Sequence, residues 1–197
     1  MKKLLLLILI LIFSSTSIYS QNLQAYTKVN DTIFMSNSLS YAKPISIYLP
    51  KEWQEDINNT FPLTIVFDRQ NKNINGHIIN TIDYLTATTQ IPSSIIISID
   101  SKRNKRYLET SHKENNDKGL INQNIDFLFK ELIPYAEREL KANTFRLFIG
   151  HSRYAFFSAN LFVNHINDVT AVIALDPFFI DGNIHIGKIK QFSQYGY

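Results

Sequence analysis

The stretch Phe145-Arg146-Leu147-Phe148-Ile149-Gly150-His151-Ser152-Arg153-Tyr154 decides the fold expected for this 197-residue chain. Residues 145–149 are an apolar run with one charge, and residues 155–163 (AFFSANLFV) have the composition of a helix. A buried strand, a sharp turn centred on a serine and then a helix is the local structure of a nucleophile elbow. Such a turn lifts the serine hydroxyl clear of the sheet. The helix N-terminus then offers backbone N–H groups and a positive dipole end where an oxyanion would form.

Ser152 is therefore the candidate nucleophile. The strand–turn–helix context supports this assignment more strongly than the five-residue motif at 150–154 does. The usual motif is G-x-S-x-G, whereas residues 150–154 read G-H-S-R-Y, so one of the two glycines is absent. The alternative is a serine in an ordinary turn. A serine alone is not nucleophilic at neutral pH, and it needs a histidine within hydrogen-bond reach and an acid that orients the histidine.

Strands and helices alternate on both sides of this stretch. After one or two strands within residues 21–40, the expected elements are strands at 42–49, 63–67 and 95–99, helices at 74–85 and 121–140, a long polar loop at 100–117, a strand at 145–149, a helix to about 164, and a strand at 170–175. Pro134 lies where it can kink the second of these helices. This order predicts an α/β fold with a mainly parallel sheet and helices on both faces.

The first twenty residues have the features of a secretory signal peptide. Residues 2–3 (KK) are basic, residues 4–13 are an unbroken apolar run, and residues 14–20 are small and polar. The apolar run is shorter than the ~20 residues of a membrane-spanning helix. We expect removal of residues 1–20 and a periplasmic or extracellular domain at 21–197; an uncleaved N-terminal anchor is the alternative.

Composition limits the remaining possibilities. The chain has no cysteine, so an exported domain would depend on its apolar core rather than on disulfides. Loss of the two N-terminal lysines lowers the formal charge from +3 to +1. A nearly neutral chain gives no electrostatic reason to expect nucleic acid or an anionic membrane as a partner. No metal site and no cofactor are expected.

Five segments follow one another in an order that a known family shares. They are residues 45–50 (ISIYLP), 61–68 (FPLTIVFD), 91–99 (IPSSIIISI) with Arg103 and Arg106-Tyr107 after it, 131–135 (ELIPY) and 148–152 (FIGHS). With them the chain, from about residue 33 to 181, resembles the putative esterase family of the α/β-hydrolase superfamily. That family includes secreted ferric-enterochelin-esterase-like and S-formylglutathione-hydrolase-like enzymes. The resemblance implies an α/β-hydrolase fold and hydrolysis of a small-molecule carboxylic ester through acyl transfer to Ser152.

Two departures from the family pattern stand out. The family has Gly-Gly where this chain has Tyr154-Ala155, and a tyrosine there must point elsewhere or push strand and helix apart. The family's acid and histidine lie on later elements than this sequence reaches. We therefore expect a domain truncated at its C-terminal end. The strand at 170–175 would then need a partner or a missing C-terminal segment to cover it.

The acid and the base are harder to assign than the nucleophile. Asp176 ends the strand after the elbow helix, on the rim where ligands bind in such sheets, and is a candidate acid; a turn aspartate before Pro177 is the alternative. His185 is the one histidine downstream of that strand and is the candidate base. His77 and His165 are expected on the surface of helices, and His151 is expected to pack beside the serine. His112 lies in the long polar loop and is the alternative base if His185 does not serve.

An oxyanion hole needs two backbone N–H groups. Arg153, directly after the serine, supplies one candidate. The resemblance implies a second just after the strand at 63–67, where Arg69 is the candidate and Gln70 is next. Arg103 and Arg106 could meet an anionic substrate, although a basic exposed loop is the simpler interpretation.

Three functional hypotheses remain open from the sequence. The first is a secreted or periplasmic serine esterase. The second is a catalytically impaired relative that keeps the fold as a binding or interaction module, which Tyr154, Ala155 and the missing base favour. The third is a fragment of a longer esterase gene.

Overall fold

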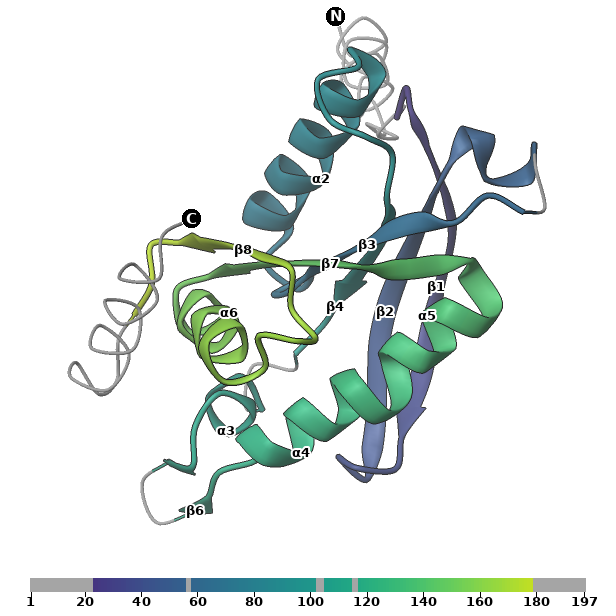
Figure 1. The fold of residues 1–197 in the computed structure, drawn as a ribbon. Helices are drawn as coiled ribbons and strands as arrows, with labels where there is room; N and C mark the ends of the chain where they lie inside the picture. The colour runs from purple at the N-terminus through teal and green to yellow at the C-terminus, as the bar shows by residue number, and fades with distance from the viewer. Residues whose placement is uncertain (1–22, 56–57, 102–104, 115–116, 179–197) are drawn as a thin grey trace, which may run out of the picture.

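A six-stranded mixed sheet forms the centre of the computed structural model, which describes residues 23–55, 58–101, 105–114 and 117–178 (Figure 1). Its strands are β1 (Tyr26–Ser36), β2 (Tyr41–Pro50), β3 (Phe61–Val66), β4 (Ile95–Ile99), β7 (Ala142–His151) and β8 (Ala171–Leu175). They lie side by side in the order β1-β2-β4-β3-β7-β8. The pairings of β1 with β2 and of β2 with β4 are antiparallel, and the other three are parallel. The expected mainly parallel sheet is thus confirmed.

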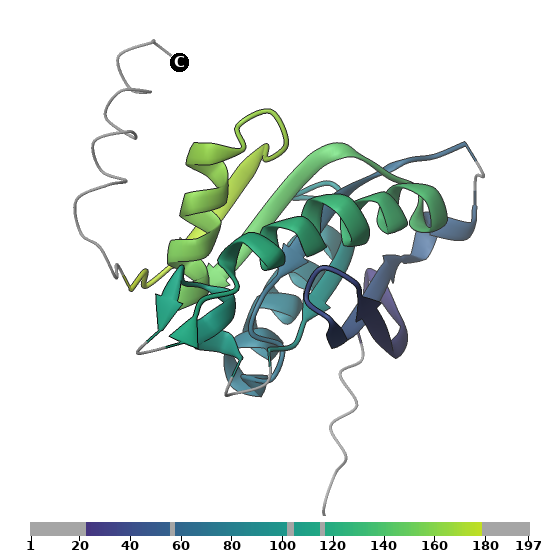
Figure 2. The ribbon, with the colours of Figure 1, turned by 90° about the horizontal axis from the view of Figure 1, so that it is seen from below.

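Helices cover both faces of this sheet (Figures 1 and 2). The helical elements are η1 (Lys51–Gln54), α2 (Lys72–Ala87), α3 (Arg106–Glu109), α4 (Ile121–Asp126), η2 (Phe127–Leu132), α5 (Ile133–Leu140) and α6 (Arg153–Asn164). Figure 1 shows α2 on one face, with the α4–α5 rod and α6 on the other. Successive residues of a strand point to opposite faces, so Ile65 packs in the α4–α6 core while Val66 packs against α2. This burial on both faces explains why the central strands are apolar runs rather than alternating ones.

The long helix expected at 121–140 is present, but it is not uniform. Its middle, η2, is a π-helix that ends just before Ile133 and Pro134. Proline has no N–H to donate to the carbonyl four residues earlier, and wider π turns are one way in which a helix adjusts to such a gap. The helix ends at Lys141, whose left-handed backbone (φ 64°) lets its N–H donate to Ala136 O.

The polar stretch after β4 contains more structure than the sequence indicated. It holds the short helix α3 and a two-stranded ladder of β5 (Lys113–Glu114) and β6 (Asp117–Lys118). These elements are too short for hydrophobic periodicity to reveal them. Arg103 lies outside the described residues, as do residues 1–20 and His185. In the described ranges, no helix is long and apolar enough to cross a membrane.

The α2 face of the sheet is covered only in part. Beyond α2, the strands β7 and β8 present Phe145, Ile173 and Leu175 with 44%, 44% and 37% of their surfaces exposed. These side chains and α2 line an apolar hollow of about 510 Å³. Phe145, Ile173 and Leu175 thus form an exposed apolar surface in the described part of the chain, and its coverage by a partner or a later segment stays a prediction.

Candidate active site

Ser152 occupies a strained turn between β7 and α6. Its backbone has φ 56° and ψ −116°, a conformation that residues with a side chain rarely adopt. The turn depends on Gly150, because a Cβ at this position would lie 2.2 Å from Tyr154 O. The sequence therefore builds the tight strand–turn–helix that the motif predicts.

Three backbone hydrogen bonds hold the serine in this turn. Its N–H donates to Leu175 O at 2.9 Å, which ties it to the end of β8. Its carbonyl accepts from Phe156 N at 3.2 Å and from Phe178 N at 3.1 Å. The serine side chain makes no capping hydrogen bond to its own helix, so the hydroxyl is not consumed by α6.

Tyr154, which replaces the second glycine, points into the core. It is 1% exposed, and its ring stacks on Phe67 with centroids 4.6 Å apart and an angle of 12° between the planes. It also meets Phe157 edge to face at 5.8 Å. Of the two outcomes expected for a tyrosine at this position, the structure has the first: the side chain points away from the strand–helix contact.

The Tyr154 hydroxyl ends in a buried polar cluster around Glu109. It donates to Glu109 Oε2 at 2.5 Å and lies 2.5 Å from Ser101 Oγ. Lys43 Nζ pairs with the same carboxylate oxygen at 2.7 Å, and the Tyr41 hydroxyl donates to the other oxygen. Tyr41 and Lys43 come from β2, Ser101 from the loop after β4 and Tyr154 from α6, so the cluster joins these three to α3, which carries Glu109.

Burial and the neighbouring charges together set the pKa shifts in this cluster. Burial raises the pKa of Glu109, but the Lys43 charge and the hydrogen bonds from Lys43, Ser101 and Tyr154 outweigh burial and hold it below its usual value. Burial lowers the pKa of Lys43 despite the nearby carboxylate. Burial and the Glu109 charge raise the pKa of Tyr154, so this phenol stays protonated and can donate.

An ion pair that sequence reasoning missed lies beneath the elbow. Asp68, two residues after the end of β3, is 2% exposed and has a positive φ of 63°. Arg106 donates to both of its carboxylate oxygens, from Nε and from Nη2, at 2.8 Å each. The same Nη2 lies 3.4 Å from His151 O. Arg106 is therefore an internal clamp rather than part of an exposed basic loop. An aspartate directly after an apolar strand marks Asp68 in the sequence, but no sequence signal joins it to Arg106.

The two oxyanion candidates lie on separate segments. Arg153 begins α6, so its N–H lies in the first turn of the helix. The guanidinium carbon of Arg153 lies 4.2 Å from the ring centroid of Tyr107 and 5.5 Å from the ring centroid of Phe178. The N–H of Arg69 donates to Ile99 O at 3.0 Å. The Arg69 N–H could therefore bind an oxyanion only after giving up its hydrogen bond to Ile99 O.

Asp176 lies next to the elbow. It directly follows Leu175, whose carbonyl binds the Ser152 N–H, and its φ is 47°. It is exposed. Its position at the carboxyl end of β8 is the one anticipated for a candidate acid, and this role remains a prediction.

The described residues do not bring a histidine into a hydrogen bond with Ser152 Oγ. His77 and His112 are exposed, and His165 stacks on Phe129 with centroids 4.9 Å apart. His151 Nδ1 is buried without a hydrogen-bond partner. Across the described ranges there is also no group of three or more His, Cys, Asp or Glu that could hold a metal ion.

Comparison with known proteins adds a family to this geometry. The family model described as "Putative esterase" matches residues 36–191. No curated protein matches the chain.

Many solved structures share the fold at low sequence identity. An IroE-like serine hydrolase from Shewanella oneidensis is 21% identical with a TM-score of 0.68, and the match covers 84% of this chain and 55% of that one. The siderophore hydrolase EstB from Aspergillus nidulans is 17% identical with a TM-score of 0.64, over 87% of this chain and 65% of that one. A ferulic acid esterase from Anaeromyces mucronatus is 15% identical with a TM-score of 0.61, over 80% and 61%. These likenesses confirm the expected α/β-hydrolase architecture, and this chain spans little more than half of the first of these proteins.

Proposed function

The chain belongs to the putative esterase family, and from this premise we propose that it hydrolyses a carboxylic ester through an acyl-enzyme on Ser152. The observation that supports this most directly is the backbone of Ser152, held at φ 56° between β7 and α6. Strain of this kind persists only where the surrounding structure holds it, and it concentrates at functional sites. The names of similar structures suggest methyl ferulate as one probe beside simple p-nitrophenyl esters.

The proposed reaction has two acyl-transfer steps. Ser152 Oγ attacks the ester carbonyl carbon while a histidine takes its proton, and the carbonyl oxygen becomes an oxyanion. The first turn of α6, which begins at Arg153, offers N–H groups and a positive dipole end to that charge. The intermediate then collapses, and the alcohol leaves with the proton. Water attacks the acyl-serine in the same way and releases the acid.

The base is assigned to His185, with Asp176 as the acid that orients it. This assignment rests on the order Ser, Asp, His along the chain and on the position of Asp176 beside Leu175 and the elbow. If a longer gene product supplies the histidine instead, residues 23–178 still provide the nucleophile.

We place the reaction outside the cytoplasm. The basic residues 2–3, the apolar run at 4–13 and the small residues at 14–20 support an export signal. Mass spectrometry of the exported protein tests this, and a mature chain that still begins at Met1 would contradict it.

A fluorophosphonate probe tests the nucleophile. We expect the probe to label the protein at Ser152 and labelling to be lost in Ser152→Ala, while Ser93→Ala, outside the elbow, labels as the parent protein does. Triad members act as a unit, so His185→Ala should cost as much activity as Ser152→Ala. Rapid ester turnover that survives both substitutions would refute the proposal.

A second function is favoured by Tyr154 and its anchor on Glu109. A tyrosine fixed in the core where the family has glycine, with no histidine bound to Ser152 among the described residues, suits a relative that keeps the fold for binding. A folded protein that neither reacts with fluorophosphonates nor hydrolyses esters, with or without a family-like C-terminal segment, would favour this function.

A further inference from the structure

Two side chains of the short helix α3 contact the chain on either side of Ser152. Arg106, the first residue of α3, donates from Nη2 to the carbonyl oxygen of His151 at 3.4 Å, and His151 directly precedes the serine. Glu109, the last residue of α3, accepts at Oε2 from the Tyr154 hydroxyl at 2.5 Å, and Tyr154 lies two residues after the serine. A single turn of helix therefore contacts both flanks of the nucleophile.

Tyr107 adds a third contact from the same turn. Its ring centroid lies 4.2 Å from the guanidinium carbon of Arg153, the residue directly after the serine. Tyr107 is 41% exposed, and a contact between a cation and an aromatic ring is weak at an exposed site. The contacts of Arg106 and Glu109 are therefore the ones that can restrain the elbow.

The helix α3 is itself attached to the sheet at both of its ends. Asp68, which is 2% exposed, accepts from Nε and Nη2 of Arg106 at 2.8 Å each. Lys43 Nζ pairs with Glu109 Oε2 at 2.7 Å, and the exposed fractions of these two side chains are 2% and 0%. Ion pairs buried to this degree are costly to break, because either partner alone would be an uncompensated charge. The position of α3 is therefore fixed before it contacts the elbow.

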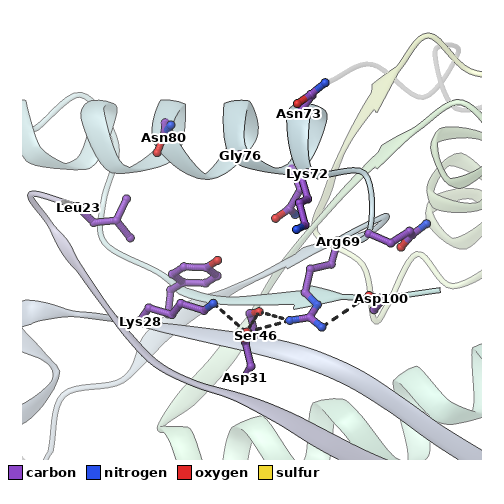
Figure 3. A pocket seen from close by; sticks show the side chains of 13 residues that line it. Leu23, Lys28, Asp31, Ser46, Arg69, Lys72, Asn73, Gly76, Asn80 and Asp100 are labelled. Atoms are coloured by element: carbon purple, nitrogen blue, oxygen red, sulfur yellow. Dashed lines mark hydrogen bonds and ion pairs between the residues drawn. The ribbon is translucent and has the colours of Figure 1, made fainter. Parts of the chain in front are cut away.

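The segment that carries Asp68 is fixed in turn by the next residue, Arg69. Figure 3 looks into the pocket between α2 and β1 and shows Arg69 reaching from this segment to the strands. Its Nη1 donates to Asp31 Oδ1 at 2.9 Å and to Ser46 Oγ at 2.8 Å. Its Nη2 lies 3.6 Å from Asp100 Oδ2. Side-chain contacts therefore join the anchor of α3 to β1, to β2 and to the end of β4.

Ser152 requires such support. Its backbone, at φ 56° and ψ −116°, is strained for a residue with a side chain, and strain of this kind persists only where the surrounding structure fixes it. We propose that α3 holds Ser152 in this conformation and that Arg106 and Glu109 are positioning residues for the nucleophile. Arg106 acts through the carbonyl before the serine, and Glu109 acts through Tyr154. The effect on catalysis rests on the acyl transfer proposed for Ser152, whereas the effect on its backbone does not.

NMR of the ¹³C,¹⁵N-labelled protein reads the backbone of Ser152 without any need for activity. Arg106→Lys removes the fork that holds α3 to the elbow. Tyr154→Phe keeps the ring and removes only the hydroxyl, so the buried ion pair of the cluster stays intact. In both variants we expect the Cα and Cβ shifts of Ser152 to move from values of a positive-φ backbone toward those of negative φ. The matched controls, Arg138→Lys and Tyr84→Phe, change the same residue types at exposed positions and should leave these shifts unchanged.

Fluorophosphonate labelling measures the consequence for the nucleophile. Each of the two variants should lower the second-order rate constant of labelling at least about tenfold, because a misplacement of about 1 Å can cost about 10²-fold in rate. The loss should be the same at two temperatures at which circular dichroism shows the variant to be folded. A merely structural role would instead lower the rate only in proportion to the folded fraction. For p-nitrophenyl acetate, kcat and kcat/KM should fall equally.

The outcomes separate this proposal from the proposed function. If the parent protein is not labelled at all, acyl transfer to Ser152 is wrong, and the NMR comparison alone decides whether α3 holds the serine. The proposal is overturned if either variant leaves the Ser152 shifts as the controls do, or if labelling slows while the shifts stay unchanged. It is also overturned if the shifts move while the labelling rate stays at that of the parent protein.

Discussion

At the scale of single residues, the two glycine positions of the elbow motif have different requirements. At Gly150 a Cβ would collide with the backbone of Tyr154, since the nearest atom lies 2.2 Å away. At position 154 the side chain leaves the backbone toward Phe67 and finds a full set of core contacts. The motif therefore tolerates loss of its second glycine but not of its first.

We predict that Gly150→Ala destabilises the protein. The collision is with backbone atoms, which cannot rotate away, so we expect a loss of about 3 kcal/mol in the free energy of unfolding, measured with urea. Gly76→Ala, in the interior of α2, is the matched control and should instead stabilise by about 0.5–1 kcal/mol. Equal effects of the two substitutions would contradict this explanation.

We predict that Tyr154→Phe costs stability although the ring remains. The change removes the hydroxyl that donates to Glu109, and a hydrogen bond to a charged group contributes about 1.5–3 kcal/mol. Tyr84→Phe, at a side chain that is 59% exposed, should change the free energy of unfolding by less than about 0.5 kcal/mol. A cost for Tyr154→Phe no larger than for the control would show that the buried hydroxyl contributes nothing.

At the scale of elements, polar clamps join pieces that the sheet leaves independent. Arg106 attaches α3 to the end of β3 through Asp68, and it reaches the carbonyl of His151. Glu131 accepts from the backbone N–H of Asn37 and Ser38, which attaches the helix rod to the β1–β2 turn. In each clamp one carboxylate accepts hydrogen bonds from several donors, and such charge-assisted hydrogen bonds are strong and directional.

We predict that Arg106→Lys releases α3 from the elbow. Lysine has one ammonium and cannot reproduce the two-pronged contact with Asp68, so the substitution is not conservative here. Backbone amides of residues 106–109 should exchange with deuterium faster than in the parent protein. Arg138→Lys, at an exposed arginine of α5, is the control and should leave exchange at residues 106–109 unchanged. Unchanged exchange in Arg106→Lys would refute the clamp.

The sequence predicted the elements that hydrophobic patterns can report. Apolar runs at 63–67, 95–99 and 170–175 became β3, β4 and β8, and the helical spacing from Ile74 to Leu85 became α2. The ladder β5–β6 and the π-helix η2 carry no such pattern, because one is too short and the other differs from an α-helix only in its hydrogen bonds. The elbow was predictable because strand, turn and helix are consecutive. The Asp68–Arg106 and Lys43–Glu109 pairs were not, because they join distant positions that only the fold brings together.

At the scale of the whole molecule, three carboxylates couple stability to pH. The pKa values of Asp31, Glu109 and Glu131 lie below their usual values in the folded chain. A lowered folded pKa gives stability that is fully present above the unfolded pKa and lost as pH falls through the folded pKa. We predict that the free energy of unfolding declines as pH falls below about 4.5, the usual value for glutamate.

Glu109→Gln isolates one contribution to this acid sensitivity. The variant should be less stable at neutral pH, because Lys43 loses its buried partner, and its stability should fall less steeply below pH 4.5. Glu139→Gln, on the exposed side of α5, is the control. If the free energy of unfolding of Glu109→Gln falls as steeply below pH 4.5 as that of the parent protein, the assigned direction of the Glu109 pKa shift is wrong.

The apolar face of β7 and β8 predicts association. Exposed Phe145 and Ile173 line the apolar hollow next to α2, and large apolar patches favour contact with other molecules. We expect the purified chain to self-associate in light scattering, and Phe145→Ser with Ile173→Ser to reduce this. The control, Ile33→Ser with Met35→Ser, changes exposed apolar side chains on β1 at the opposite edge of the sheet. A chain that is monomeric without the substitutions would refute this prediction.

The position of β3 has a kinetic consequence. It lies between β4 and β7, with Leu63 paired to Ile95 on one side and to Arg146 on the other. The pairing with β7 joins segments far apart in sequence, and such pairings form slowly because a long loop must close first. During synthesis β1 to β4 emerge well before β7 can cover the free edge of β3. A chain interrupted before residue 142 would leave that apolar strand edge open to other chains, so premature release should yield aggregates rather than a smaller folded unit.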